Sequence, residues 1–287
     1  ERREDLTLLS LPESERKSLP ARAALAREAD VAFLCLPDEA SRELVAALEG
    51  KAARVLDTST AHRTDPRFAY GFPELGGAYA AAIAASDRVA VPGCHASGAI
   101  ALAYPLRQAG LLDAAAPLCF TSLTGYTGGG KKMIAEYEAD GRAACYDAPR
   151  AYGVGQAHKH LPEIAKVCGL ATPPIFQPVV CDYPCGMLVS LPLWPARMGQ
   201  TLGGLRALYA RAYANQPLLR VAPPNAEPML AANALAGRDV MELLLTGTDE
   251  RCIAYARFDN LGKGASGAAI ECMNLMLGLP IETGLTL

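Results

Sequence analysis

The chain has 287 residues, a net charge of −3 and a hydrophobic fraction of 51%, a balance that excludes a disordered or collagen-like protein. A weakly acidic chain without a long basic run is not expected to bind nucleic acid in general. The length allows one large domain or two of about 100–200 residues each. Since no run of about 18 apolar residues is present, we expect no membrane span. The charged residues 1–5 predict no secretory signal.

The nine cysteines are typical of a protein from a reducing compartment and not of a disulfide-linked scaffold. Their number is odd, and several lie in apolar runs, as Cys35 does in VAFLCL (residues 31–36). A large chain with this pattern is typical of a reducing environment, where cysteines stay as thiols. We therefore expect the protein to be cytoplasmic.

The first third of the chain alternates apolar strands with helices. Residues 31–36 are continuously apolar, as in a parallel strand that is covered on both faces. Asp38 favours the start of the next helix and Gly50 favours its end. Further elements are predicted as a strand at 6–9, a helix at 21–29, and strands at 54–56 and 88–91. This order predicts a parallel α/β sheet up to about residue 93.

The pattern changes after that point. A helix is predicted from residue 97 to about 108, and Pro105 within it should kink it. Strands are predicted at 118–123, within 175–193, and as a pair at 240–245 and 252–258, before a last helix at 265–277. Long strands in this order predict an antiparallel sheet, and hence an α+β second domain.

Two glycine-rich motifs resemble nucleotide-binding signatures but lack a required part. GYTGGGK (residues 125–131) is followed by Lys132, where a phosphate-binding loop needs Ser or Thr to bind magnesium. GKGASG (residues 262–267) fits G-x-G-x-x-G but is followed by no predicted strand, and Glu282 is the one candidate acid. The first motif is either a flexible loop or a loop whose N–H groups hold an anion. The second lets a helix start approach a ligand closely.

Cys94 is the candidate nucleophile. It follows a predicted strand and a Pro-Gly turn, and a helix follows it. The positive end of a helix dipole favours the thiolate, which is the nucleophilic form of cysteine. The alternative is a buried structural cysteine, which is how we interpret most of the other eight.

A cysteine nucleophile needs a base, and the chain has four histidines. In an extended segment, His158 and His160 would face the same side, and Glu163 could orient either ring. A solvated polar segment is the alternative. A zinc site made by these two histidines with Cys181 and Cys185 is a weaker hypothesis, because no close C-x-x-C pair is present and we expect no metal.

Five segments, in this order, carry a resemblance to a known family: DTSTAHR (57–63), VPGCHASG (91–98), GYTGGGKK (125–132), HKHLPEI (158–164) and KGASGAAIECMNLMLG (263–278). Together they resemble the N-acetyl-γ-glutamyl-phosphate reductases of the shorter type 2 subgroup. The likeness extends from about residue 6 to the C-terminus. Aspartate-semialdehyde dehydrogenases are relatives with a similar fold and the same cysteine chemistry.

The resemblance implies an NADP-dependent enzyme of arginine biosynthesis. It would convert N-acetyl-γ-glutamyl phosphate to N-acetylglutamate γ-semialdehyde, with release of phosphate, through a thioester on Cys94. The resemblance also implies His158 and His160 as base and substrate contact, without deciding which does which. The implied substrate contacts are Arg63, Gly125, Tyr126 and Glu163. The implied cofactor contacts are Ser10, Arg16, Leu36, Pro37, Ser59, Ser97, Gly98, Lys263, Gly264 and Gly267.

The implied fold class is α/β, with a Rossmann-like NADP-binding domain at 1–94 and 264–287. An α+β catalytic and oligomerisation domain would span 95–263. The family begins with a strand and a G-x-x-G-x-x-G loop, and roughly 20 residues of such a start are expected to be absent before residue 6. We expect a homo-oligomer, either a dimer or a tetramer.

Three alternatives stay open. An aspartate-semialdehyde dehydrogenase or another acyl-phosphate reductase would share the chemistry. These enzymes differ in the length of their substrates, which a sequence alone predicts poorly. A Cys–His hydrolase or acyltransferase would use Cys94 and His158 without NADPH. An inactive paralogue or an assembly subunit would show no cofactor-dependent turnover.

Overall fold

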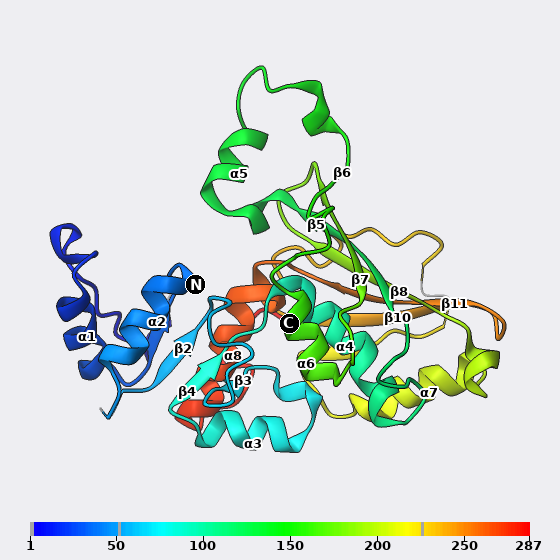
Figure 1. Cartoon of the computed structure of the whole chain (residues 1–287), viewed down its shortest axis with the longest axis horizontal. Helices are drawn as coiled ribbons and strands as arrows, with labels where there is room; N and C mark the ends of the chain where they lie inside the picture. Colours follow the sequence, from blue (N-terminus) through cyan, green and yellow to red (C-terminus); the bar gives the residue numbers. More distant parts are fainter. Residues whose placement is uncertain (1–2, 51–52, 225–226) are drawn as a thin grey trace. The chain divides into compact units, whose positions relative to one another are not determined.

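The computed structural model describes residues 3–50, 53–224 and 227–287. The chain forms two compact units. Unit 1 comprises Glu1–Pro73, Gly77–Pro92 and Ala268–Leu285. Unit 2 comprises Glu74–Gly76, Gly93–Gly267 and Thr286–Leu287. Each unit therefore combines segments that are distant in the sequence, as the colours in Figure 1 show.

Unit 1 is built on a parallel sheet of four short strands in the order β1-β2-β4-β3. Their bounds are β1 Ala32–Leu34, β2 Val55–Asp57, β3 Ala69–Tyr70 and β4 Arg88–Ala90. The pairs β1–β2, β2–β4 and β3–β4 are all parallel. The prediction of a parallel α/β sheet in this part of the chain is confirmed.

Helices pack on this sheet through two apolar clusters. α1 (Leu19–Glu28) and α2 (Asp38–Ala47) share one cluster, which includes Leu34, Leu44 and Val55. α8 (Gly267–Leu277) contributes Cys272 and Met273 to a second cluster with Leu56 and Val89. α3 (Gly77–Ala85) adds Ile83 to this second cluster. The last helix of the chain therefore belongs to the core of the first unit.

The predicted strand at residues 6–9 is wrong, because this segment is irregular in the structure. Leu8 is 91% exposed, and Leu6 and Leu9 are each 41% exposed. In the described sheet β1 is an outer strand and pairs with β2 alone. An apolar run becomes a strand only where a partner satisfies its backbone and covers its side chains, and here it has neither.

Unit 2 contains a sheet of seven strands in the order β6-β7-β5-β8-β11-β10-β9. The strands are β5 Cys119–Gly125, β6 Arg150–Ala151, β7 Ile175–Cys181, β8 Met187–Leu193, β9 Leu219–Val221, β10 Met241–Gly247 and β11 Cys252–Phe258. The predicted hairpin appears as β10 and β11, which pair over seven residues from Met241–Phe258 to Gly247–Cys252.

The prediction that this second sheet is antiparallel is wrong in part, because it is mixed. β5 pairs with β7 in parallel, and β9 pairs with β10 in parallel. Between β5 and β7 the chain forms α6 (Leu161–Cys168), and such crossover connections are what parallel neighbours require. Sequence periodicity did not reveal this helix, which is eight residues long.

α4 (Cys94–Gln108) is the central helix of unit 2, and 11 of its 15 residues are buried. It packs against β8 at Gly98, where an added Cβ would lie 2.5 Å from Val189 Cγ2. α7 (Leu202–Ala212) supports it from another side, because the hydroxyl group of Tyr209 donates to the carbonyl of Leu102 in α4. These contacts fix the helix that begins at Cys94.

The segment of residues 126–149, here called the arm, leaves the sheet after β5 and returns at β6 (Figure 1). It includes α5 (Gly130–Tyr137), and Tyr126, Tyr137 and Tyr146 pack together within it. The guanidinium carbon of Arg150 lies 4.0 Å from the ring centre of Tyr146, which is a cation–π contact. In the part of the chain that the structure describes, no helix is long and apolar enough to cross a membrane.

Candidate active site

Cys94 is the first residue of α4, directly after a Gly93 N-cap with extended backbone. The N–H of Gly93 donates to Glu163 Oε1 in α6 at 2.9 Å. Glu163 is 1% exposed. The predicted position of Cys94 at a helix start is confirmed, and the adjoining N–H groups and helix dipole favour negative charge on its sulfur. The predicted substrate contact of Glu163 stays a prediction, since the contact seen is with the backbone.

Three histidine rings gather beside this helix start. The centre of the His95 ring lies 5.5 Å from that of His158 and 5.6 Å from that of His160. The rings of His158 and His160 are 4.8 Å apart. Phe176 of β7 packs against both His95 and His158 at 5.3 and 5.0 Å. The structure thus brings both predicted histidines together with a third histidine, the residue next to Cys94.

His158 and His160 lie in a turn that leads into α6, with His160 as the N-cap residue, and not on a strand. The backbone N–H of His160 donates to His158 Nδ1 at 3.3 Å. Burial, with a smaller contribution from the charge of Lys159, lowers the pKa of His158 to about 4. A neutral ring that accepts at Nδ1 carries its proton on Nε2. His158 therefore presents an N–H donor at neutral pH.

His95 is 3% exposed and is held at both ring nitrogens. Nδ1 lies 2.6 Å from Ser122 Oγ in β5, and Nε2 lies 2.6 Å from the hydroxyl oxygen of Tyr152. Burial, with smaller contributions from the charges of His158 and Lys159, lowers the pKa of His95 to about 3. His95 is therefore neutral at physiological pH and takes part in a fixed hydrogen-bond chain.

Tyr152 follows β6 and is partly buried beside the histidines. Its backbone N–H donates to the carbonyl of Pro178 in β7 at 3.1 Å. Burial raises the pKa of Tyr152, and the charge of Cys94 raises it further. The phenol is therefore protonated at neutral pH.

A helical turn with π-type hydrogen bonding, Gly262–Ser266, lies against the start of α4. A Cβ on Gly264 would lie 3.0 Å from Cys94 Cβ and 3.0 Å from the carbonyl oxygen of Asp259, so only glycine allows this approach. Asp259 Oδ1 accepts from the N–H groups of Leu261 and Gly262 and shapes the turn. The backbone of this turn therefore packs closely against Cys94, and the predicted cofactor contact of Gly264 stays a prediction.

Lys263, a predicted cofactor contact, is 2% exposed, and its Nζ lies 2.5 Å from Glu74 Oε1, which is fully buried. Gly267, another predicted contact, packs against Asp239, since a Cβ there would lie 2.3 Å from Asp239 Oδ1. Ser97 donates to the carbonyl of Gly93 at 3.2 Å. These three contacts lie within unit 2, and the predicted cofactor roles of Lys263, Gly267 and Ser97 stay predictions.

Gly125 and Tyr126, predicted substrate contacts, form the corner between β5 and the arm. A Cβ on Gly125 would lie 2.3 Å from the carbonyl oxygen of Pro184. Tyr126 donates its hydroxyl proton to Glu138 Oε1 at 3.1 Å. Asn260, which the sequence analysis missed, holds this corner through Thr127 Oγ1 at 3.0 Å. The glycine motif is therefore a tightly packed corner.

In unit 1, predicted cofactor residues follow the carboxyl ends of parallel strands, where dinucleotides bind in such sheets. Leu36 and Pro37 follow β1, and Ser59 follows β2. Asp57, the last residue of β2, is fully buried and accepts from the N–H and the hydroxyl of Ser59, both at 2.9 Å. Leu36, Pro37 and Ser59 therefore lie at the expected edge of the sheet, and their cofactor contacts stay predictions.

The other predicted residues of unit 1 lie in irregular segments. Arg63 donates to the carbonyls of Thr58 at 2.7 Å and Val91 at 2.9 Å, so it ties together the segments that follow β2 and β4. Ser10 is exposed, and Arg16 is exposed and ion-paired with Glu13 at 2.7 Å. The predicted roles of Arg63, Ser10 and Arg16 stay predictions.

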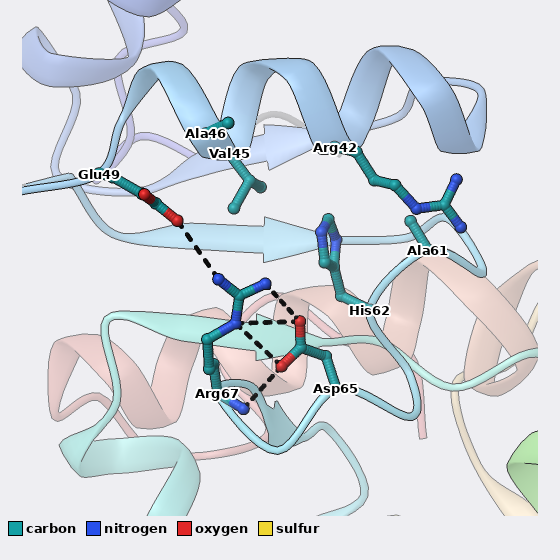
Figure 2. A pocket seen from close by; sticks show the side chains of 8 residues that line it. All are labelled: Arg42, Val45, Ala46, Glu49, Ala61, His62, Asp65 and Arg67. Carbon is teal, nitrogen blue, oxygen red and sulfur yellow. Dashed lines mark hydrogen bonds and ion pairs between the residues drawn. The ribbon is translucent and has the colours of Figure 1, made fainter.

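A pocket of about 190 Å³ lies between α2 and the loop after β2, as Figure 2 shows. Arg67 crosses its mouth, paired with Asp65 at 2.7 Å and with Glu49 at 3.3 Å. The buried ring of His62, stacked on Phe68, forms one wall. The complete lining is Arg42, Val45, Ala46, Glu49, Ala61, His62, Asp65 and Arg67. None of these is a predicted cofactor contact.

Sequence reasoning missed Ser122 and Tyr152 as members of the site, and it placed His95 beside Cys94 without giving it a role. His95 follows Cys94, and Tyr152 lies six residues before His158, so proximity along the chain was the one available signal. Ser122 had none, because it belongs to a different element. Within the described ranges no group of three or more His, Cys, Asp or Glu side chains could hold a metal ion, so His158, His160, Cys181 and Cys185 form no such group.

Two family models match the chain in the order of its units. A model described as "Semialdehyde dehydrogenase, NAD binding domain" matches residues 7–83. A model described as "Semialdehyde dehydrogenase, dimerisation domain" matches residues 94–260 and so begins at Cys94. The fold and the site thus define a protein of the semialdehyde dehydrogenase class.

Proteins named N-acetyl-gamma-glutamyl-phosphate reductase are the relatives that align with it. The one from Brucella anthropi is 46% identical over 285 residues, which cover 96% of this chain and 92% of the relative. Those from Brucella canis and Sinorhizobium fredii are each 45% identical with the same coverage. The chain belongs to the N-acetyl-γ-glutamyl-phosphate reductase family, as the resemblance implied.

Solved structures support the fold independently. Aspartate semialdehyde dehydrogenase II from Vibrio cholerae aligns with a TM-score of 0.64 and 14% identity, covering 88% of this chain and 81% of that one. Aspartate semialdehyde dehydrogenase from Francisella tularensis aligns with a TM-score of 0.65 and 13% identity, covering 89% and 84%. At this identity the likeness concerns the fold alone.

Proposed function

We propose that this chain reduces N-acetyl-γ-glutamyl phosphate to N-acetylglutamate γ-semialdehyde, with NADPH as the reductant and Cys94 as the nucleophile. The observation that carries the proposal is the position of Cys94 at the first residue of α4, directly before His95. The ring of His95 lies against those of His158 and His160, and its Nε2 lies 2.6 Å from the hydroxyl oxygen of Tyr152. This supplies a thiolate-favouring field and several N–H and O–H donors in one place. The family of the chain supports the choice of substrate.

Cys94 would perform the two covalent steps. Its sulfur attacks the acyl carbon of the acyl phosphate, the C–O bond to phosphate breaks, and inorganic phosphate leaves with the electron pair. After reduction of the resulting thioester, the C–S bond breaks and the thiolate is released as the aldehyde forms. An acyl phosphate is already activated, so orientation and a stabilised oxyanion provide most of what the reaction needs.

The two histidines of HKHLPEI would divide the remaining tasks. His158 accepts the His160 N–H at Nδ1 and so offers Nε2–H, which suits it to hold a substrate oxygen. His160 is then the candidate base for the Cys94 thiol. The sequence left these two roles open, and exchange of either histidine for Asn tests this assignment through the pH profile of the acylation step.

A nicotinamide cofactor would be held by the residues predicted for it, and each unit is considered by itself. Leu36, Pro37 and Ser59 follow strands at the carboxyl edge of the parallel sheet of unit 1. In unit 2, Gly264 packs closely against Cys94 and is kept as a predicted cofactor contact. When bound, the cofactor supplies the hydride that reduces the thioester. An NAD(P)-binding domain belongs to the family, and the preference for NADP over NAD is part of the proposal.

Assembly and location follow from the same family. We expect a homo-oligomer in which unit 2 contributes the contacts, consistent with the family description of residues 94–260 as a dimerisation domain. We expect the protein in the cytoplasm, because all nine cysteines are free thiols in the structure. Size-exclusion chromatography with light scattering would give the number of subunits.

The test is the reverse reaction, the phosphate-dependent reduction of NADP by N-acetylglutamate semialdehyde, followed by absorbance of the reduced nicotinamide. Parallel assays would replace NADP by NAD, and the substrate by aspartate semialdehyde. Turnover that requires phosphate and prefers NADP and the acetylated substrate supports the proposal. Preference for aspartate semialdehyde would assign the chain to the alternative reductase, and hydrolysis without nucleotide would assign it to the hydrolases.

A further inference from the structure

The outer edge of β7 is paired by backbone over only part of its length. β6 pairs with β7 as far as Val179 and ends there. One residue further along this edge, the N–H of Tyr152 donates to the carbonyl of Pro178 at 3.1 Å. Phe176, two residues before Pro178, presents its own N–H and carbonyl on the same edge, because alternate residues of a strand direct their backbone groups to the same side.

The side chain of Gln156 pairs with this last part of the edge. Its Nε2 donates to the carbonyl of Phe176, and its Oε1 accepts from the N–H of Phe176, both at 2.9 Å. A carboxamide offers a donor and an acceptor side by side, so it satisfies both backbone groups as a residue of a neighbouring strand would. Gln156 thereby continues the pairing of β7 beyond the end of β6.

The backbone of Gln156 does not itself favour a glutamine. Its φ is 55°, in the left-handed region that glycine adopts without strain and that longer side chains adopt rarely. Its N–H donates to the carbonyl of Gly153 at 3.1 Å and closes a turn. The two hydrogen bonds with Phe176 therefore account for a glutamine at a position whose backbone suits glycine.

Phe176 contacts the histidines through its ring as well. The ring centre of His158, the second residue after Gln156, lies 5.0 Å from that of Phe176 with an interplanar angle of 63°. His95 lies against the same ring at 5.3 Å. Two residues of chain span at most about 7 Å, so a tie between Gln156 and the backbone of Phe176 restricts where the imidazole of His158 can lie.

We propose that Gln156 is a positioning residue for His158, because its carboxamide ties the segment before the two histidines to the edge of β7 and so holds the imidazole against Phe176. In this place Nδ1 of His158 accepts from the N–H of His160. The inference rests on the proposed function in one respect, the contact of His158 with the substrate. Without the carboxamide the segment would move away from the edge, while β7 would keep its pairing with β5 over seven residues.

The experiment follows the ring of His158 in long-range ¹H–¹⁵N spectra of the uniformly labelled full chain between pH 5 and pH 8. The chain has four histidines, and His158→Asn identifies the signals of this one. Its titratable or charged neighbours are His95, His160, Tyr152 and Lys159. Burial lowers its pKa to about 4, so we expect a neutral wild-type ring with its proton on Nε2 over the whole range.

Two variants separate the carboxamide from the backbone. Gln156→Gly removes the carboxamide and suits the left-handed backbone, whereas Gln156→Met keeps a side chain of similar length and removes both hydrogen bonds. In each variant we expect the pKa of His158 to rise by about two units, toward its ordinary value of 6.5, and the neutral ring to populate both tautomers. Urea unfolding establishes that each variant is folded, and either one alone suffices for the test.

The matched control is Gln177→Ala, which removes a neighbouring glutamine of β7 whose Oε1 accepts from Thr121 of β5 at 3.3 Å. It should leave the titration of His158 as in the wild type. A glutamine that only stabilises the sheet edge would lower the unfolding midpoint when replaced and leave the His158 titration unchanged, and this result in a folded Gln156 variant would overturn the proposal.

The spectra require neither substrate nor cofactor, so they test the position of His158 independently of the proposed reaction. If the proposed function were wrong, the wild-type chain would fail in the reverse-reaction assay, while the shift of the His158 titration in the Gln156 variants would remain. If Gln156 did not position His158, the wild-type chain would turn over and the shift would be absent.

Discussion

Glu163 Oε1 accepts a hydrogen bond from the backbone N–H of Gly93, the residue directly before Cys94. This contact joins α6, whose N-cap is His160, to α4, whose first residue is the nucleophile. The candidate base and the candidate nucleophile are thereby fixed to each other by a buried carboxylate. The contact also gives the glutamate at position 163 a role that does not require contact with a substrate.

Replacing Glu163 by Ala should therefore affect both stability and rate. The buried N–H of Gly93 would lose its acceptor, at a cost of about 1–3 kcal/mol, and the start of α4 would be held less firmly. We expect a lower midpoint of urea unfolding and a lower kcat, with a smaller loss for Glu163→Gln, which keeps an acceptor oxygen. If Glu163→Gln instead changed KM for the acyl phosphate alone, the predicted substrate contact would be correct.

Replacing Cys94 by Ser should abolish turnover while the fold stays intact. Loss of a nucleophile costs several orders of magnitude, so kcat should fall at least about 10³-fold. The matched control is Cys119→Ser, an exposed cysteine at the start of β5, which should retain wild-type turnover. Residual activity of Cys94→Ser above about a tenth of wild type would exclude the covalent mechanism.

The buried ion pair of Lys263 and Glu74 predicts a large stability change. Lys263→Met would leave a buried carboxylate without its partner, which costs about 3–5 kcal/mol. The double variant Lys263→Met with Glu74→Leu should recover most of that loss, because both charges are then removed. Urea unfolding measures both effects, and the exposed Lys132→Met, which breaks a 3.9 Å pair with Glu136, should behave as wild type.

A different result at Lys263 would support its predicted cofactor contact. If Lys263→Met raised KM for NADPH and left the unfolding midpoint unchanged, the ion pair would be unimportant and the cofactor contact would be favoured. The unfolding curve and the kinetic constant therefore test two interpretations of the same residue.

The depressed pKa of His95 predicts how stability depends on pH. The folded-state pKa is about 3, below the ordinary value of 6.5. Between these values the unfolded chain binds a proton that the folded chain does not, so stability is retained above pH 6.5 and decreases as pH falls toward 3. Between pH 7 and pH 5 this single group should reduce stability by roughly 2 kcal/mol. The difference should disappear in His95→Gln, measured by urea unfolding at both values.

If His95→Gln showed the same pH dependence as wild type, His95 would titrate normally in the folded protein. That outcome would also argue against the neutral ring on which the hydrogen-bond chain to Tyr152 depends. The comparison uses differences between variants, so contributions from other groups, such as the Asp65 carboxylate whose pKa Arg67 lowers to about 2, cancel.

Local sequence patterns predicted most of unit 1 and the position of Cys94. Apolar runs around Phe33 and Leu56 became β1 and β2, and the Pro-Gly turn before Cys94 became the start of α4. These features depend on residues that are close together in the sequence, and a local sequence pattern therefore contains the information needed to predict them. The irregular segment at 6–9 was mispredicted because strand formation depends on a partner strand, and a run of leucines carries no information about its partner.

The contacts among site residues could not be predicted for a related reason. His95 meets Ser122 across 27 residues and Tyr152 across 57, and each contact depends on the register of strands that pair elsewhere. The parallel pairing of β5 with β7 sets which residues of β5 face the histidines, and the prediction of an antiparallel sheet could not supply it. The residue types were enough to suggest a cysteine nucleophile with a histidine base. The contacts among the site residues depend on the order and register of the strands, which the residue types do not give.

The pairing of β6 with β7 bears on how the family can diverge. Arg150 is in register with Val180 and Ala151 with Val179, directly before Tyr152. The return of the chain from the arm is therefore anchored at the sheet, independently of the path taken through residues 126–149. We therefore expect a change in the length of the arm to leave the phenol of Tyr152 in place, because the strand before it is held by β7.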